Sequence, residues 1–174
     1  MKWKLSIACV IVALGSALNA QSKESASPDG LTGTWLVQVT LRNCATNAPL
    51  GTFSSIVTFH RGGTVSESTS SPAFAIGQRS PGHGTWAANG HASFSQRMVS
   101  LINFDTAPNL PGPGFDPSLP VGPGFFAGWA TVTHTLQLTD ADHATSVGTN
   151  DFYKAGETSP YRSGCSSATS TRFE

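Results

Sequence analysis

The chain has 174 residues, of which 11% are charged, and its formal net charge is zero. A nucleic-acid-binding protein needs a basic stripe that releases counterions from phosphates, and so weakly charged a chain has none. The 18 glycines and 11 prolines, beside abundant serine and threonine, exclude a helical bundle, because these residues end helices or compete with their hydrogen bonds. The composition predicts short strands joined by turns.

The first twenty residues have the pattern of a secretory signal peptide. Lys2 and Lys4 precede an apolar run over residues 5–14, and residues 17–20 form a cleavage site of the A-x-A type. The run is too short, and too closely followed by polar sequence, to be a transmembrane segment. We therefore expect an exported protein, periplasmic or extracellular, that is cleaved after Ala20.

Cleavage divides the chain into three expected parts. These are a signal peptide over residues 1–20, a flexible N-terminal tether over residues 21–30 and a single folded domain over residues 31–174. Because both leader lysines are removed, the remaining chain has eight basic and ten acidic residues, a net charge of −2. This balance again argues against nucleic acid as a partner.

Two cysteines remain once the leader with Cys9 is removed. An exported protein with an even number of cysteines usually pairs them, so we expect a disulfide between Cys44 and Cys165. Cys44 lies at the end of the first predicted strand and Cys165 at the start of the last, so the bridge would join the two ends of a closed sheet. Two buried free thiols are the alternative. The sequence has no Cys-x-x-Cys pair, and we expect no metal site.

Eight segments alternate between apolar and polar residues with the period of two that is typical of half-buried strands. They are residues 34–41, 52–60, 64–69, 84–88, 91–105, 130–139, 143–153 and 164–173. Short turns separate them, among them Asn89-Gly90, a preferred pair for a two-residue hairpin. No amphipathic helix is available to cover the apolar faces. We predict an all-β fold, a single up-and-down antiparallel barrel of about eight strands; a two-sheet sandwich is the alternative.

The segment over residues 107–124 departs from the strand pattern. It is rich in proline and glycine, and proline cannot donate a hydrogen bond to a sheet, so we predict a long loop. Its apolar residues, such as Leu110 and Phe115, suit a flap over the mouth of a barrel. A surface flap without a role in binding is the alternative.

Several short motifs resemble those of an exported bacterial family of lipocalin-like, or calycin, barrels whose function is uncharacterised. They are Gly33-Thr34-Trp35, the turn from Phe59 to Thr64, Arg79-x-x-x-His83-Gly84-x-Trp86, and Gly164-Cys165-Ser166 near the end. The resemblance covers most of residues 31–173 and implies export and a barrel whose closed end is plugged by Trp35. The loop over residues 107–124 is longer than the family pattern, and no catalytic residue is carried over.

His134 is the first candidate for a functional side chain. It shares the apolar face of its strand with Val132 and Leu136, so closure of a barrel would turn its imidazole inward. There it would be a polar anchor for a ligand or an acid/base group near neutral pH. The alternative is a core histidine bonded to a neighbouring serine, threonine or carbonyl.

Glu67 is the second candidate, and its direction depends on the preceding turn. A three-residue loop over residues 61–63 would turn the carboxylate inward, where it needs a partner such as Arg97 or His134, or a raised pKa. A two-residue turn would direct Glu67 outward, because a shift of one residue reverses every side chain.

Four further residues complete the candidate ligand-binding set. Arg79 and His83 lead into Trp86, and they would either grip an anion at the barrel mouth or hold a loop carbonyl. Trp86 and Trp35 are the candidate aromatic contacts. The five histidines are scattered without a metal-binding signature, and we expect no cofactor.

Binding of a small apolar molecule inside the barrel is the function that we favour, since small barrels can enclose one ligand. One alternative is a barrel enzyme, an isomerase, cyclase or hydrolase that uses Glu67 and His134. The other is an envelope-associated structural protein whose barrel is filled with side chains. The enzyme requires the two side chains to converge, and the structural protein requires a barrel without a cavity.

Overall fold

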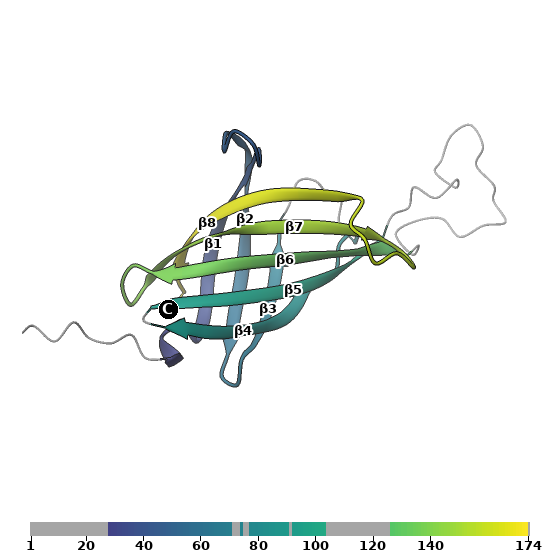
Figure 1. The fold of residues 1–174 in the computed structure, drawn as a ribbon. Coiled ribbons are helices and arrows are strands. Elements are labelled where there is room, and N and C mark those ends of the chain that lie inside the picture. Colours follow the sequence, from purple (N-terminus) through teal and green to yellow (C-terminus); the bar gives the residue numbers. More distant parts are fainter. Residues whose placement is uncertain (1–27, 71–73, 75–76, 91, 104–125, 174) are drawn as a thin grey trace, which may run out of the picture.

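The computed structural model describes residues 28–70, 74, 77–90, 92–103 and 126–173. They form one closed barrel in which each strand is antiparallel to its neighbours in the sequence (Figure 1). The strands are β1 (Gly33–Arg42), β2 (Pro49–His60), β3 (Thr64–Thr69), β4 (Gly82–Gly90), β5 (Ser93–Asn103), β6 (Phe126–Leu138), β7 (His143–Lys154) and β8 (Arg162–Arg172). The predicted signal peptide and the loop over residues 107–124 lie outside the described residues.

Closure depends on the pairing of the first strand with the last. β1 pairs with β8 from Trp35 opposite Arg172 to Arg42 opposite Cys165. Figure 1 shows β4 to β8 crossing in front of β1 to β3. The up-and-down barrel is thereby confirmed, and the sandwich alternative is wrong: a sheet that pairs its own edges covers its apolar face without a second sheet.

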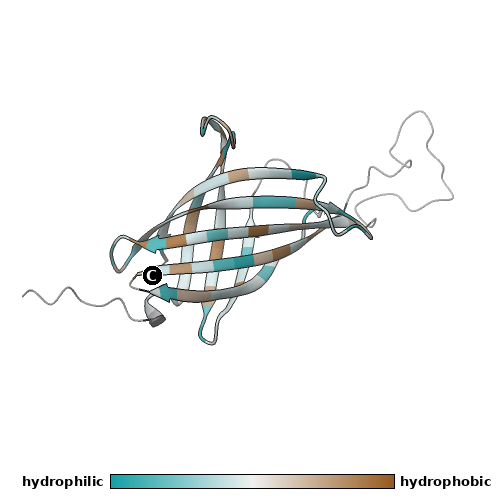
Figure 2. Cartoon of the chain, in the orientation of Figure 1, coloured by the Kyte–Doolittle hydropathy of each residue, from teal (hydrophilic) through white to brown (hydrophobic). Residues whose placement is uncertain are grey.

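Figure 2 shows hydrophobic and hydrophilic residues interspersed along the strands, and successive residues of a strand point to opposite faces of the sheet. On β5, for example, Phe94 and Met98 are buried while Val99 and Leu101 are exposed. The buried core cluster consists of Leu31, Trp35, Val57, Phe59, Val65, Phe94, Met98, Leu136 and Ala144. These residues gather toward one end of the barrel, which leaves the other end less densely filled.

That filled end is sealed by a short 3₁₀ helix, η1 (Pro28–Leu31), beneath Trp35. The indole Nε1 donates a hydrogen bond to the Leu31 carbonyl at 2.9 Å, and the Arg172 guanidinium lies 4.3 Å from the ring centroid. Arg172 also donates to the carbonyls of Gly30 and Thr32. The last residues of the expected tether, from Pro28 to Gly30, belong to this helix.

The hairpin between β4 and β5 differs from the prediction. β4 continues to Gly90, which pairs with Ser93, and the register shifts between Ala88 and Gly90. A two-residue turn at Asn89-Gly90 would have turned Phe94 out of the core. The expected turn was therefore wrong, because burial of Phe94 and the apolar residues that alternate with it outweighs the local turn preference.

Candidate ligand-binding cavity

A cavity of about 300 Å³ lies inside the barrel between the Trp35 end and the opposite, open end. Its apolar wall includes Val37, Val39, Val57, Met98, Val132 and Leu136. The mouth is lined by Leu41, Leu50, Phe53, Phe74, Phe152 and Tyr161. The walls are thus largely apolar, with a small number of polar side chains among them, as in most small-molecule sites.

One row of those polar side chains crosses four neighbouring strands. Gln96 on β5 is opposite His134 on β6, His134 is opposite Gly148 on β7, and Gly148 is opposite Ser166 on β8. Gln96, His134 and Ser166 all line the cavity. Because Gly148 has no side chain, the imidazole of His134 extends across β7 to the next strand.

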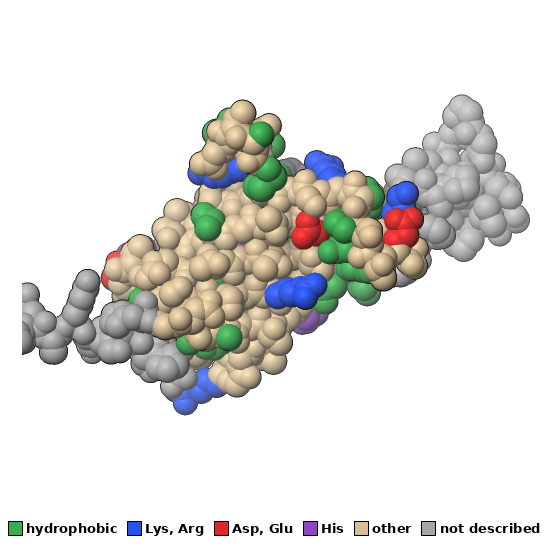
Figure 3. All heavy atoms as spheres, viewed as in Figure 1, with side chains coloured by type: hydrophobic (Ala, Val, Ile, Leu, Met, Phe, Trp, Pro, Cys, Tyr) green, Lys and Arg blue, Asp and Glu red, His purple; other side chains and the backbone are tan. Residues whose placement is uncertain are grey.

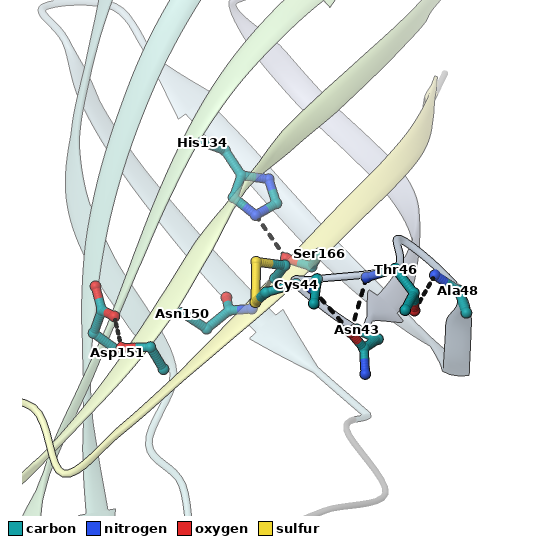
Figure 4. Close-up of a disulfide and its surroundings, with 11 residues drawn as sticks. Asn43, Cys44, Thr46, Ala48, His134, Asn150, Asp151 and Ser166 are labelled. Carbon is teal, nitrogen blue, oxygen red and sulfur yellow. Dashed lines mark hydrogen bonds between the residues drawn. A yellow bond between two sulfur atoms is a disulfide. The ribbon is translucent and has the colours of Figure 1, made fainter.

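His134 is buried and hydrogen-bonded through both ring nitrogens. Nδ1 lies 3.0 Å from Ser146 Oγ, and Nε2 lies 2.8 Å from Ser166 Oγ. Asn150 donates its Nδ2–H to Ser166 Oγ at 3.0 Å. Figure 4 shows His134 and Asn150 both directed toward Ser166, beside the disulfide. The structure therefore contains the serine-bonded core histidine that was the alternative for this position.

The environment of His134 also determines its charge. Burial lowers the pKa of the imidazole from 6.5 to about 4, since desolvation disfavours the charged form. The ring is therefore neutral at pH 7, with one nitrogen donating and the other accepting. A neutral imidazole held by two hydroxyls is a polar contact rather than a counter-ion.

Glu67 points inward, as the three-residue loop predicts. Phe59 is opposite Val65 and Val57 is opposite Glu67, and the carboxylate is 8% exposed. Its charged partner is Arg79, whose guanidinium donates to Oε2 at 2.8 Å, and Ser55 Oγ donates to Oε1 at 3.2 Å. Neither partner named in the prediction forms this pair.

The two expected partners of Glu67 are engaged elsewhere or face outward. Arg97 is exposed on the outer face of β5, and His134 bonds to Ser146 and Ser166. Within the described residues, no hydrogen bond joins Glu67 to His134. The convergence that a Glu67–His134 enzyme requires is not present.

The remaining candidates lie away from the cavity. His83 is exposed on β4. Trp86 is half-buried between Phe59 and Phe94, and its Nε1 donates to the His60 carbonyl at 3.0 Å. Trp35 lies at the filled end of the barrel, where the helix η1 covers it. Of the six predicted binding residues, the cavity lining includes His134, Glu67 and Arg79.

Sequence reasoning missed the partners of His134. A polar residue at Gln96, between Phe94 and Met98 on an apolar strand face, was a readable indication of an inward amide. Ser166 had no such distinction, because serine occurs on both faces of β8, and Ser146 shares its face of β7 with Ala144 and Gly148, small residues that do not mark an inward face. The role of both serines depends on cross-strand register, which the sequence pattern does not determine.

The expected disulfide is present and lies beside the mouth. Cys44 and Cys165 are bonded, with their Cα atoms 5.2 Å apart. Figure 4 shows the disulfide at Cys44, and Cys165 contributes to the cavity lining. The bond therefore fixes the connection after β1 to β8 at the open end.

On the face shown in Figure 3, charged side chains are scattered rather than gathered into a stripe. Among the described residues, no group of three or more His, Cys, Asp or Glu side chains is arranged to hold a metal ion. No helix in the described part of the chain is long and apolar enough to cross a membrane. Comparison of the chain with protein-family models and with curated proteins found no match.

Proposed function

We propose that this protein binds a small, mostly apolar molecule inside its barrel, and that it is an exported protein of the lipocalin-like type. The observation that carries the proposal is the cavity of about 300 Å³, with apolar walls and a few buried polar groups. This combination is typical of binding sites for small molecules. A filled structural barrel is less well supported, since such a barrel would leave no space of this size.

Export to the periplasm or the extracellular space is part of the same proposal. A disulfide between Cys44 and Cys165 suits an oxidising compartment, since thiols stay reduced in the cytosol. The signal-peptide pattern over residues 1–20 supports the same compartment. Export of the protein is therefore compatible with the proposed binding of a ligand in its barrel.

Binding of a neutral naphthylamine fluorophore, whose emission rises in apolar surroundings, tests the proposal. Ala168 lines the cavity, and Ala168→Trp fills it, so we expect the affinity for the fluorophore to fall by about tenfold or more. Val147, which is 62% exposed on the adjacent strand, supplies the control. Val147→Trp places the same side chain on the outside of the barrel and should leave the affinity unchanged.

Two results would contradict binding in the barrel. One is that the folded wild-type protein gives no saturable fluorescence increase. The other is that Ala168→Trp, with an unchanged circular-dichroism spectrum, binds as well as Val147→Trp. In the second case the fluorophore occupies a surface site.

A further inference from the structure

Gln96 has an unusual position for an amide. Its side chain is 7% exposed and lines the cavity, yet Oε1 is buried without a hydrogen-bond partner. No side-chain hydrogen bond of the Gln96 amide is found within the described residues. An unpaired buried amide is unfavourable, and a ligand group is one way to satisfy it. Rotation about the soft terminal torsion can present either end of the amide to the cavity.

A second unused polar group lines the same cavity as this amide. The neutral imidazole of His134 has one N–H, so it donates to one of its two serines and accepts from the other. Whichever tautomer is present, one hydroxyl hydrogen, of Ser146 or of Ser166, has no acceptor within the described network. Asn150 does not accept this hydrogen, because its amide donates to Ser166 Oγ.

The two unused groups lie on different strands but line the same cavity. Gln96 on β5 is the direct cross-strand partner of His134 on β6, and His134 in turn bonds to Ser146 on β7 and Ser166 on β8. The inward side chains of a small barrel converge on its interior. A ligand group inside the cavity, between Gln96 and these serines, can therefore contact both the amide and a hydroxyl donor.

The charges around the cavity favour an uncharged group at this row. Glu67 and Arg79 neutralise one another at 2.8 Å, and His134 is neutral at pH 7 because burial lowers its pKa. The other arginines of the lining, Arg42 and Arg162, lie at the mouth end of β1 and β8. A carboxylate head would consequently be drawn to the mouth and away from Gln96.

We propose that the cavity selects an apolar alcohol, whose hydroxyl donates to Gln96 and accepts from the unused serine hydroxyl of the His134 network. A hydroxyl is the smallest uncharged group that both donates and accepts. The inference rests on the proposed binding function. A volume of about 300 Å³ equals the liquid volume of about ten water molecules, which suits a chain of decanol size.

Competition against the naphthylamine fluorophore tests this preference with ligands of equal length. Decanol both donates and accepts, a decanone only accepts, chlorodecane is nearly apolar and decanoate is charged. We expect decanol to bind about tenfold more tightly than chlorodecane, with the decanone between them and decanoate weaker than decanol. These measurements use the wild-type protein and do not depend on whether a variant folds.

Gln96→Met then removes the amide with little change in shape. We expect the affinity for decanol to fall by about tenfold and that for chlorodecane to stay the same. The melting temperature of the free variant should rise, because an unpaired buried amide has been replaced by an apolar group. The control is Gln137→Met, at an exposed glutamine of the adjacent strand, which should change none of these values.

Failure of this inference differs from failure of the proposed function. If the fluorophore binds but decanol and chlorodecane compete equally, the barrel binds ligands without selecting a hydroxyl. Equal losses for both ligands in Gln96→Met, or tightest binding by decanoate, would overturn the inference as well. If neither fluorophore nor any ligand binds to the folded protein, the binding function itself is refuted.

Discussion

At Gly148 the absence of a side chain allows His134 to reach Ser166. Gly148 lies between these two residues in the cross-strand row, so the imidazole passes over its backbone. A Cβ built at Gly148 overlaps His134 Cδ2 and the Thr133 carbonyl, and it lies 2.8 Å from His134 Cα. The glycine is therefore part of the site although it supplies no functional group.

We expect Gly148→Ala to lower the free energy of unfolding by about 1–3 kcal/mol or more, because backbone and imidazole must both move. Gly51→Ala is the matched control, since a Cβ at Gly51 meets nothing within 4 Å. That change should stay within about 0.5 kcal/mol. Urea denaturation of both variants measures the difference. Equal effects would mean that the contact with His134 has no energetic consequence.

His134 also makes stability depend on pH. Its pKa is about 4 in the folded protein and 6.5 when unperturbed, so the unfolded chain binds more protons between these values. Stability from the neutral ring is fully present above pH 6.5 and is lost as the pH falls toward 4. From pH 7 to pH 5 this amounts to about 2 kcal/mol.

His134→Gln keeps a polar side chain but removes this titration. We expect the free energies of unfolding of wild type and variant to converge as the pH is lowered from 7 to 5, by about the same 2 kcal/mol. Urea denaturation at each pH provides the values, and carboxylate titration cancels in the difference. If the free energies of unfolding of the two proteins change in parallel with pH, the imidazole is not buried in its neutral form.

Among the elements, the β2–β3 hairpin shows how much of a structure the alternation of apolar and polar residues can predict. Alternation placed Val65 and Glu67 on one face, and the three-residue loop with positive φ at Gly62 and Gly63 gives the inward register, one of the two that the sequence left open. The partner Arg79 was not predictable as such. It lies before β4 in a segment that is outside the named strands and forms an isolated bridge to Ile102, and no periodic pattern marks this segment.

The β4–β5 hairpin shows the opposite outcome, because the turn preference of Asn89-Gly90 predicted the wrong register between the two strands. Asn89-Gly90 is a favourable turn pair, but a turn there would bury Ser93 and Ser95 in place of Phe94. Where a turn preference and the alternation of large apolar residues disagree, the apolar residues decide. Fold class and the inward direction of His134 were predictable, whereas the row that joins it to Gln96 and Ser166 needed the register of four strands.

In the whole molecule, the β1–β8 seam is held at both ends by different chemistry. At the closed end Arg172 lies over Trp35 and bonds to carbonyls of the N-terminal segment. At the open end Cys165 is bonded to Cys44, just beyond the last pair of the seam. The first and last strands are the farthest apart in the sequence, so both interactions hold the least local strand pairing of the barrel.

The disulfide closes a loop with a sequence separation of 121 residues, for which the chain-entropy model gives about 4–5 kcal/mol of stabilisation. We expect the Cys44→Ser/Cys165→Ser double variant to lose most of this free energy in urea denaturation. Hydrogen exchange should accelerate most at the Cys165 end of β8. The Arg172 end retains its packing on Trp35 and should exchange at a rate set by global unfolding alone.

A titration of free thiols provides the control for this prediction. Unfolded, unreduced wild-type protein without its leader should contain no free thiol, and reduction should expose two per chain from Cys44 and Cys165. If both ends of β8 exchange equally faster in the double variant, the bond acts only through the entropy of the unfolded chain. A larger change at the open end instead means that the bond holds the mouth of the cavity, whose lining includes Cys165, and that its loss should also weaken ligand retention.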